Sequence, residues 1–171
     1  MTTTTIAPQL AQERLDLLET LQAHRDFLRF TVRDLTDEQA RQRTTASALT
    51  LGGLVKHVTT TEAEWAGFLI GGAAGMGTDT QEYGADFRME DSDTLARLLA
   101  AYEEVAARTD ELVGALPDLD ASHELPAAPW FPPGKHWSAR RVLLHLVAET
   151  SQHAGHADIL RETLDGQRTM G

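Results

Sequence analysis

Four long stretches of this sequence place apolar residues at steps of three, four and seven, the spacing of one face of an α-helix. The stretches run from Gln9 to about Asp34, from Thr50 to Ile70, from Ser92 or Asp93 to Leu116, and from Ser138 to about Leu164. Thr36 and Gln39, spaced as a capping box, predict a short helix after the first stretch. The sequence shows no strand pattern, so we expect an all-α, four-helix bundle.

Two long connections lead into and out of the third of these helices. Residues 71–91 are rich in Gly, Asp and Thr and are typical of a flexible crossover loop, because their glycine run lacks the Gly-Lys-Ser/Thr ending of a phosphate-binding loop. Residues 117–137 hold five of the six prolines. Connections of this length allow neighbouring helices to run parallel. We expect one domain over residues 1–171, with residues 1–8 and 165–171 frayed.

Composition excludes several classes of function. The net charge of −11 argues against a nucleic-acid partner, whose phosphates need Lys and Arg. No apolar stretch approaches the ~20 residues that span a bilayer, and the N-terminus has no secretory signal, so we expect no membrane partner and a cytoplasmic location. The chain has no cysteine, so any thiol in its chemistry must arrive as a substrate.

The last helical stretch carries polar groups where its pattern calls for hydrophobic ones. Glu149 and His153 are four residues apart and project from one face, which Leu146 and Leu160 continue. Burying unpaired polar groups costs on the order of 2–7 kcal/mol, and a bound metal ion is the simplest compensation. If the side of Leu143 faces inward instead, the two residues form an ordinary surface pair worth about 0.2–0.5 kcal/mol.

A metal site needs at least three protein ligands, so a further ligand must come from a facing helix. His57 in the second helix is the natural candidate, because Thr61 and Glu64 continue its side as a polar flank that borders the core. His24 lies on the apolar side of the first helix and is better explained as a core histidine.

Two histidines flank the polar pair of the last helix and leave other ligand sets open. His145 precedes Glu149 by four residues, and His156 follows His153 by three. Both spacings place side chains on one helix face. The rival sets are therefore His145 with Glu149, and His153 with His156.

The stretches Leu-Val-Lys-His57-Val and Glu149-x-x-x-His153-x-Gly-His156 resemble the DinB-like superfamily, and more narrowly its actinobacterial branch of mycothiol-dependent enzymes. Most members carry one histidine on the second helix and His-x-x-x-His on the fourth. Here Glu149 replaces the first of that pair, as in mycothiol-dependent maleylpyruvate isomerases. The resemblance covers essentially the whole chain. It implies the metal ligands His57, Glu149 and His153, supporting roles for His145 and His156, and an up-down-down-up order of helices.

The resemblance also implies a metal-dependent transferase or isomerase. Two imidazoles and a carboxylate suit Zn²⁺, with nickel, manganese or iron as alternatives. The site would activate a low-molecular-weight thiol, mycothiol in an actinobacterium, for attack on a small electrophile. In the proline-rich loop, Trp130 and Trp137 would either wall the electrophile's pocket or cap the bundle end. Arg161 would pair with an acidic substrate or with a surface carboxylate.

Three other functions fit the same residues. A non-catalytic metal- or ligand-binding bundle would bind metal without thiol turnover. A non-haem iron enzyme uses the same set of two histidines and a carboxylate. A purely structural bundle would tolerate Glu149→Ala. Apolar surface left over on the first or third helix also leaves a homodimer open.

Overall fold

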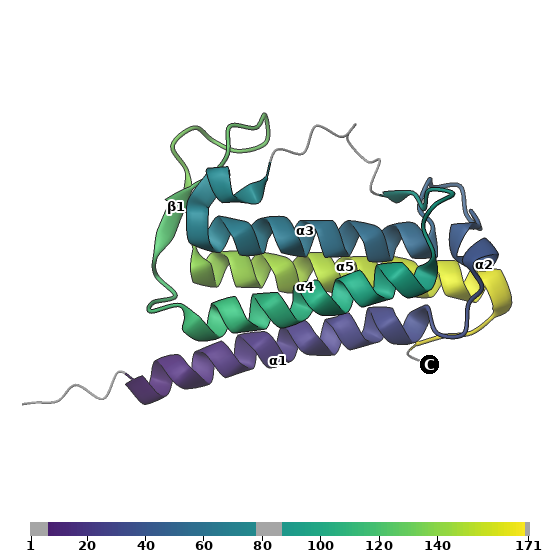
Figure 1. Ribbon diagram of the computed structural model, residues 1–171, viewed down its shortest axis with the longest axis horizontal. Coiled ribbons are helices and arrows are strands. Elements are labelled where there is room, and N and C mark those ends of the chain that lie inside the picture. The colour runs from purple at the N-terminus through teal and green to yellow at the C-terminus, as the bar shows by residue number, and fades with distance from the viewer. Residues whose placement is uncertain (1–6, 78–86, 170–171) are drawn as a thin grey trace, which may run out of the picture.

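The computed structural model describes residues 7–77 and 87–169 of the chain. In these residues the long helices are α1 (Ala7–Thr31), α3 (Leu51–Gly71), α4 (Leu95–Ala115) and α5 (Ala139–Asp165), with a short α2 (Asp37–Arg41) and a 3₁₀ turn η1 (Gly72–Met76) (Figure 1). Strands β1 (Ser122–Glu124) and β2 (His136–Ser138) pair antiparallel. The predicted all-α class is confirmed. The two strands were not predicted, because three residues each are too few to show an alternating pattern.

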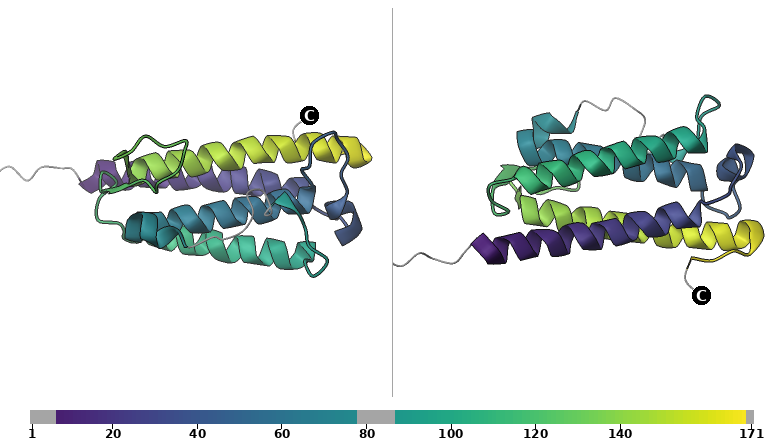
Figure 2. Two further views of the ribbon diagram at one scale, coloured as in Figure 1. Left: turned by 90° about the horizontal axis from the view of Figure 1, so that it is seen from above. Right: turned by 60° about the horizontal axis from the view of Figure 1, so that its bottom comes forward.

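The long helices run in the order up, down, down, up, which the views from two further directions also show (Figure 2). Arg140 at the start of α5 pairs with Glu13 near the start of α1, so these two helices are parallel. Lys56 near the start of α3 pairs with Asp93 just before α4, so these two are parallel as well. The first long connection joins α3 to α4, which run in the same direction, so it must return along the length of the bundle. The second joins α4 to α5, which run in opposite directions.

Side-chain caps define the ends of the helices. The capping box at Thr36 and the cap at Ser138 are present as predicted. The cap of α4 was predicted one or two residues too early: Thr94, rather than Ser92 or Asp93, accepts a hydrogen bond from the first turn. Asp93 is instead bound to a lysine of α3 and to a backbone amide of its own loop. Three adjacent residues can all cap a helix, so contacts outside the helix decide which one does.

The C-terminal tail is bound to the bundle rather than frayed from residue 165 onward. α5 ends at Asp165, and Gly166 adopts φ +77°, which turns the chain back. Arg33 then donates to Gln167, and the Thr31 and Thr169 hydroxyls are hydrogen-bonded. At the other end α1 already includes residues 7 and 8. Residues 1–6 and 170–171, also expected to fray, lie outside the described residues.

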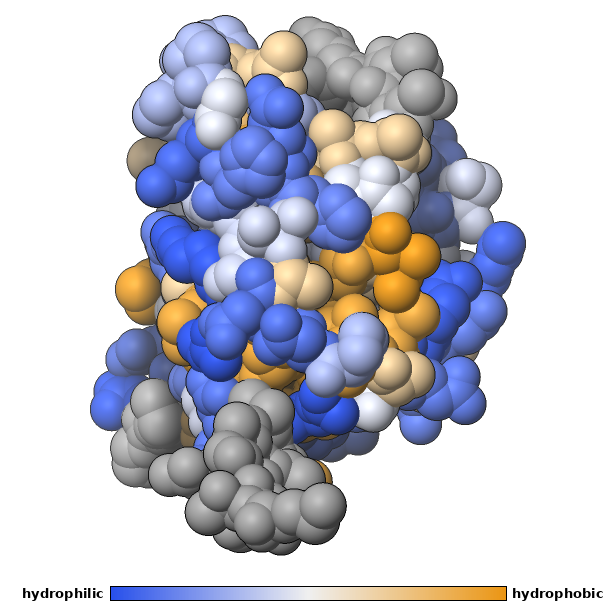
Figure 3. Space-filling view, turned by 90° about the vertical axis from the view of Figure 1, so that its left-hand side faces the viewer, coloured by the Kyte–Doolittle hydropathy of each residue, from blue (hydrophilic) through white to orange (hydrophobic). Residues whose placement is uncertain are grey.

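Each of the two long connections is partly ordered. The first, expected to be a loop over residues 71–91, begins with η1 and ends with a segment from Phe87 onward that packs on α3; residues 78–86 lie outside the described residues. The second, the proline-rich loop, carries β1 and β2 and covers one end of the bundle (Figure 1). Seen from that end, the surface is mixed, with apolar side chains exposed between hydrophilic ones (Figure 3).

The core consists of two hydrophobic clusters. One gathers around Tyr102, Val58 and Leu160, and the other around Trp65 and Leu143. None of the described helices combines the length and apolar character that a bilayer crossing requires. A buried charge cluster also lies inside the bundle, and sequence reasoning missed it: Arg25 of α1 is fully buried against Glu62 of α3.

Candidate metal centre

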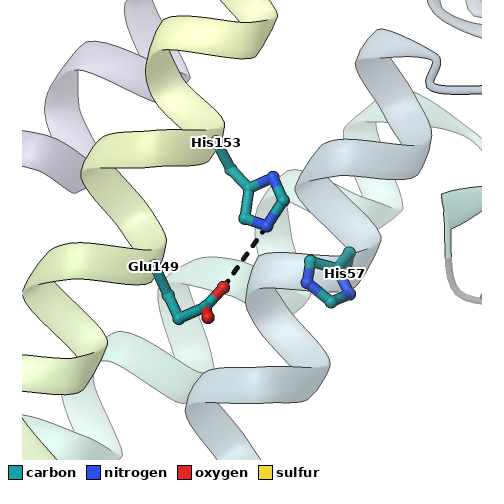
Figure 4. Close-up of side chains that lie close together, drawn as sticks. All are labelled: His57, Glu149 and His153. Atoms are coloured by element: carbon teal, nitrogen blue, oxygen red, sulfur yellow. Dashed lines mark ion pairs between the residues drawn. The ribbon is translucent and has the colours of Figure 1, made fainter. Parts of the chain in front are cut away.

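Two facing helices bring three candidate ligands together. His57 projects from the second turn of α3, and Glu149 and His153 project from α5 (Figure 4). One donor atom from each lies within 4.8 Å of the others. Nε2 of His153 lies 3.3 Å from Oε2 of Glu149, and the rings of His57 and His153 meet edge to face with centroids 4.7 Å apart. Among the described residues, this is the group of histidines and carboxylates placed to share an ion.

The α5 helix buries two of its faces rather than one. Leu146 and Leu160 are buried, as expected if the face of Glu149 and His153 points into the bundle. Leu143 is buried as well, as expected if its own side points inward instead. His153 therefore lies inside, 9% exposed, whereas the side chain of Glu149 is 29% exposed at the boundary. The carboxylate thus lies at the boundary of the helix–helix contact, and the imidazole lies inside it.

A narrow pocket adjoins the three candidate ligands. Val58 and Leu146 line it from the two core clusters, and Thr61 and Thr150 complete the lining. Sequence reasoning named Thr61 as part of a polar flank but missed Thr150, which follows Glu149 directly and is 1% exposed. The exposed lining of the pocket is thus almost entirely apolar.

The carboxyl group of Glu149 is held in its charged form. A hydrogen bond with His153 lowers its pKa, burial opposes this, and the nearby rings of His145, His153 and His57 lower the pKa further. The net pKa lies below its ordinary value of 4.5. At neutral pH this side chain is consequently an anionic oxygen ligand, which is the form that binds a metal ion.

The two flanking histidines lie beside the candidate ligands. Nε2 of His145 is 3.9 Å from Oε1 of Glu149. Nδ1 of His156 is 3.4 Å from Nδ1 of His153, so one nitrogen of His153 faces Glu149 and the other faces His156. A contact with the second nitrogen of an imidazole fixes the orientation of a ligating ring. This geometry supports the positioning roles that the family resemblance implies.

Acidification is expected to destabilise the protein through His145. Burial lowers the pKa of His145 from its ordinary 6.5, against the charge of Glu149. The unfolded chain thus takes up this proton at a higher pH than the folded chain, so this contribution to stability is present in full above about pH 6.5 and is lost as the pH falls from that value through the lower pKa of the folded chain.

A His145→Phe variant tests this expectation, because it keeps a ring against Trp65 and Trp137. Chemical denaturation of the metal-free protein between about pH 7 and pH 5 should show a shallower loss for the variant, the difference being at most about 1.4 kcal/mol per pH unit. Parallel curves would show that His145 titrates alike in both states.

The aromatic residues of the proline-rich loop cap the end of the bundle. Trp137 stacks on Trp65 with centroids 4.8 Å apart and contacts the ring of His145 edge-on at 5.1 Å. Trp130 is 67% exposed and packs against Phe131. The loop encloses a hollow of about 440 Å³, which shares no lining residue with the metal pocket. The capping role predicted as one alternative for Trp137 is therefore the one that its contacts support.

Arg161 has a structural role in place of the predicted contact with substrate. Its side chain is 2% exposed, and Nη1 donates to the backbone oxygens of Thr31 and Arg33 at 2.8 Å each. Its other nitrogens bind Asp165, a carboxylate as the alternative prediction required. These bonds satisfy the carbonyl groups at the C-terminus of α1, so the guanidinium fastens α5 to α1.

The donor set fits a divalent ion. Ligands around a tetrahedral zinc ion with bonds of about 2.1 Å lie roughly 3.4 Å from each other. The donor atoms here, within 4.8 Å of one another, reach that spacing by small side-chain rotations. An ionised carboxylate with two imidazoles also leaves further coordination positions open, as a catalytic site requires.

An all-α bundle with its long helices in up-down-down-up order is consistent with the DinB-like fold. The chain matches the family model described as Mycothiol-S-transferase over residues 16–166. It therefore belongs to the mycothiol S-transferase family, as the resemblance in its helices had indicated. No curated protein matches its sequence.

Proposed function

We propose that the protein is a metal-dependent S-transferase, or an isomerase of the same type, that activates mycothiol for attack on a small electrophile. The observation that carries this proposal is the convergence of His57, Glu149 and His153 from two helices onto one pocket. Membership of the family supports the thiol and the transfer reaction. The cytoplasm is the proposed location, because low-molecular-weight thiols are kept reduced there.

The residues of the site supply charge and shape for this chemistry. When bound, a divalent ion lowers the pKa of a coordinated thiol, so that the nucleophilic thiolate forms at neutral pH. One anionic ligand and two neutral ligands leave a net positive charge at the site, which favours an anionic sulfur over a neutral one. Val58 and Leu146 exclude water from the pocket, and the hydroxyl of Thr61 can donate to the bound thiol or electrophile.

Zinc is the proposed ion. Imidazole suits zinc, copper, iron and nickel, whereas a site of oxygen ligands alone would suit magnesium or calcium. The donor set here is two imidazoles and one carboxylate. Zinc also needs no redox partner to polarise a thiol.

The test is thiol turnover before and after removal of the metal. Purified protein should contain about one zinc ion per chain and should consume mycothiol in the presence of a reactive electrophile. Stripping with a chelator should reduce the rate to that of the uncatalysed reaction, and added zinc should restore it. Cysteine and glutathione serve as matched thiols that lack the sugar portion of mycothiol.

Three outcomes of this experiment separate the proposed function from its alternatives. One zinc per chain without turnover of any thiol would favour the non-catalytic metal-binding bundle. Activity that depends on iron and oxygen would favour the non-haem iron enzyme. Protein that binds no metal, even after reconstitution, would refute both metal readings and favour a structural bundle.

A further inference from the structure

Phe87 covers one of the candidate metal ligands. Its ring stacks on the ring of His57 with centroids 3.9 Å apart and planes at 24°. It also lies 5.8 Å from the ring of His153, at 52°. Neither helix of the metal centre contributes Phe87, which comes from the segment before α4. One aromatic side chain thus contacts both imidazoles of the site.

The first turn of α3 is shaped to receive this segment. A Cβ atom on Gly53 would lie 1.8 Å from the carbonyl oxygen of Phe87, and one on Gly52 would lie 2.3 Å from Sδ of Met89. Real side chains essentially never approach so closely, so any residue larger than glycine at position 53 must displace the backbone of Phe87. Gly53, which the helix pattern alone tolerates in a first turn, is thus required for the contact, whereas the flexible side chain of Met89 could yield at Gly52.

The segment is anchored on the far side of Phe87 as well. Met89 is 9% exposed and belongs to the core cluster around Tyr102. Asp93 accepts hydrogen bonds from the backbone of Glu90 at 2.8 Å and from Nζ of Lys56 at 3.1 Å. Since Lys56 is the residue before His57, the same turn of α3 holds both the ligand and the segment that covers it.

We propose that Phe87 is a positioning residue of the metal centre, which holds the plane of the His57 imidazole in the orientation needed to bind the ion. This inference rests on the metal site of the proposed function and assigns to it a residue outside the ligand helices. A stacked ring restricts rotation about the Cβ–Cγ bond of His57, whatever bonds the nitrogens make. Orientation of ligating imidazoles by outer partners is worth about 10–100-fold in metal affinity.

The experiment is a titration with zinc alone, in competition with a chromophoric chelator, together with the visible absorption spectrum of the Co²⁺-substituted protein. Phe87→Ala should bind zinc roughly tenfold more weakly and shift the cobalt bands, still with one ion per chain. Phe87→Tyr, which keeps the stacked ring, should resemble wild type. Gly53→Ala should resemble Phe87→Ala, because the added methyl group displaces the backbone of Phe87 and so takes its ring away from His57.

Phe30→Ala is the matched control, because Phe30 of α1 is 47% exposed and contacts no metal ligand among the interactions of its ring. Circular dichroism melts establish that each variant is folded. In the metal-free protein, the ring protons of His57 should lose an upfield ring-current shift in Phe87→Ala and retain it in Phe87→Tyr.

Two results would overturn the proposal, and they are distinguishable from each other. If wild type binds zinc and Phe87→Ala binds it equally well with an unchanged cobalt spectrum, Phe87 does not position His57, and the proposed function stands. If wild type itself binds no zinc, the proposed function fails and the role of Phe87 in metal binding fails with it.

Discussion

Glu149→Gln is expected to abolish tight zinc binding and to reduce thiol transfer to the uncatalysed rate. The substitution keeps the shape of the side chain and removes its negative charge, which the neighbouring histidine bond maintains at neutral pH. Loss of a direct ligand should cost more than the 10–100-fold in metal affinity that loss of an outer partner costs. Elemental analysis, zinc titration and the mycothiol assay measure the effect.

The fold should survive this substitution. The side chain of Glu149 is 29% exposed, and its interaction with His153 is a partly exposed pair, so its removal should change the unfolding free energy by about 1 kcal/mol or less. Glu162→Gln is the matched control, since Glu162 is an exposed carboxylate on the same helix that pairs with Arg168. It should retain both metal and activity.

Glu149→His provides a rescue that separates ligation from charge alone. Three histidines form a known type of catalytic zinc site, so this variant should recover zinc binding that Glu149→Gln loses. Retention of wild-type zinc affinity by Glu149→Gln would show that the carboxylate is not a ligand. Failure of both variants to fold would show instead that the residue serves the helix contact.

The fold could be predicted from the sequence where the signal is local. The apolar spacing of the long helices and the caps at Thr36 and Ser138 depend on residues within a few positions of each other. Glu149 and His153 belong to this category, because two residues four apart in a helix must share a face. His57 does not. Its place opposite them depends on how α3 packs on α5, so its polar flank could only suggest it as a ligand, and the resemblance to a family then connected the three residues.

The stack on His57 could not be predicted, because Phe87 lies in a connection without periodicity. Its close approach to α3 depends on Gly53, and a glycine carries no information about what approaches it. The strands of the proline-rich loop were missed for a similar reason, since their pairing of His123 with Trp137 joins residues that are far apart within that loop.

The buried charge cluster was missed although its signal was present. Arg25 follows Leu21 by four residues and precedes Leu28 by three, so it occupies the apolar face of α1. The histidine beside it, His24, was predicted to lie in the core instead, but it is only half-buried and packs edge-on against Phe27. A charged residue on an apolar face indicates a buried partner, but the partner, Glu62, lies 37 residues away and is found only in the folded chain.

Glu62→Gln is expected to cause the largest loss of stability of any single substitution considered for this protein. Arg25 is 0% exposed and Glu62 1%, and Nε of Arg25 donates to Oε2 of Glu62 at 3.2 Å. Removing one partner of a buried pair leaves an uncompensated charge, at a cost of about 3–5 kcal/mol. That is a large part of the roughly 5–15 kcal/mol that stabilises a typical domain.

The neighbours of this pair limit how far the loss can be offset. Arg25 also donates to Asp110 of α4 at 2.9 Å, but Asp110 is 42% exposed, so its charge is partly screened by water. Burial, and then the charge of Glu62, raises the pKa of Tyr102, so its hydroxyl stays neutral and cannot replace the carboxylate. The expected loss of unfolding free energy therefore lies toward the lower end of the range of about 3–5 kcal/mol, and not near zero.

Two further variants distinguish the cost of the unpaired charge from the net value of the pair. Asp110→Asn, which removes the exposed partner, should cost about 1 kcal/mol or less. The double variant Arg25→Met with Glu62→Leu should recover most of the stability lost in Glu62→Gln, because apolar residues of similar volume often replace a buried pair without loss. Guanidinium denaturation of the metal-free proteins measures the free energy of unfolding of wild type, of Glu62→Gln and of these two variants.

The position of the pair connects this prediction to the metal centre. Glu62 lies on the same helix as His57, five residues further on, and its bond to Arg25 links α3 to α1. If the double variant is as stable as wild type but binds zinc more weakly, the ion pair serves to orient α3. If both stability and zinc affinity return, close packing alone sets that orientation. Equal stability of wild type and Glu62→Gln would contradict the expected cost of a buried, unpaired arginine.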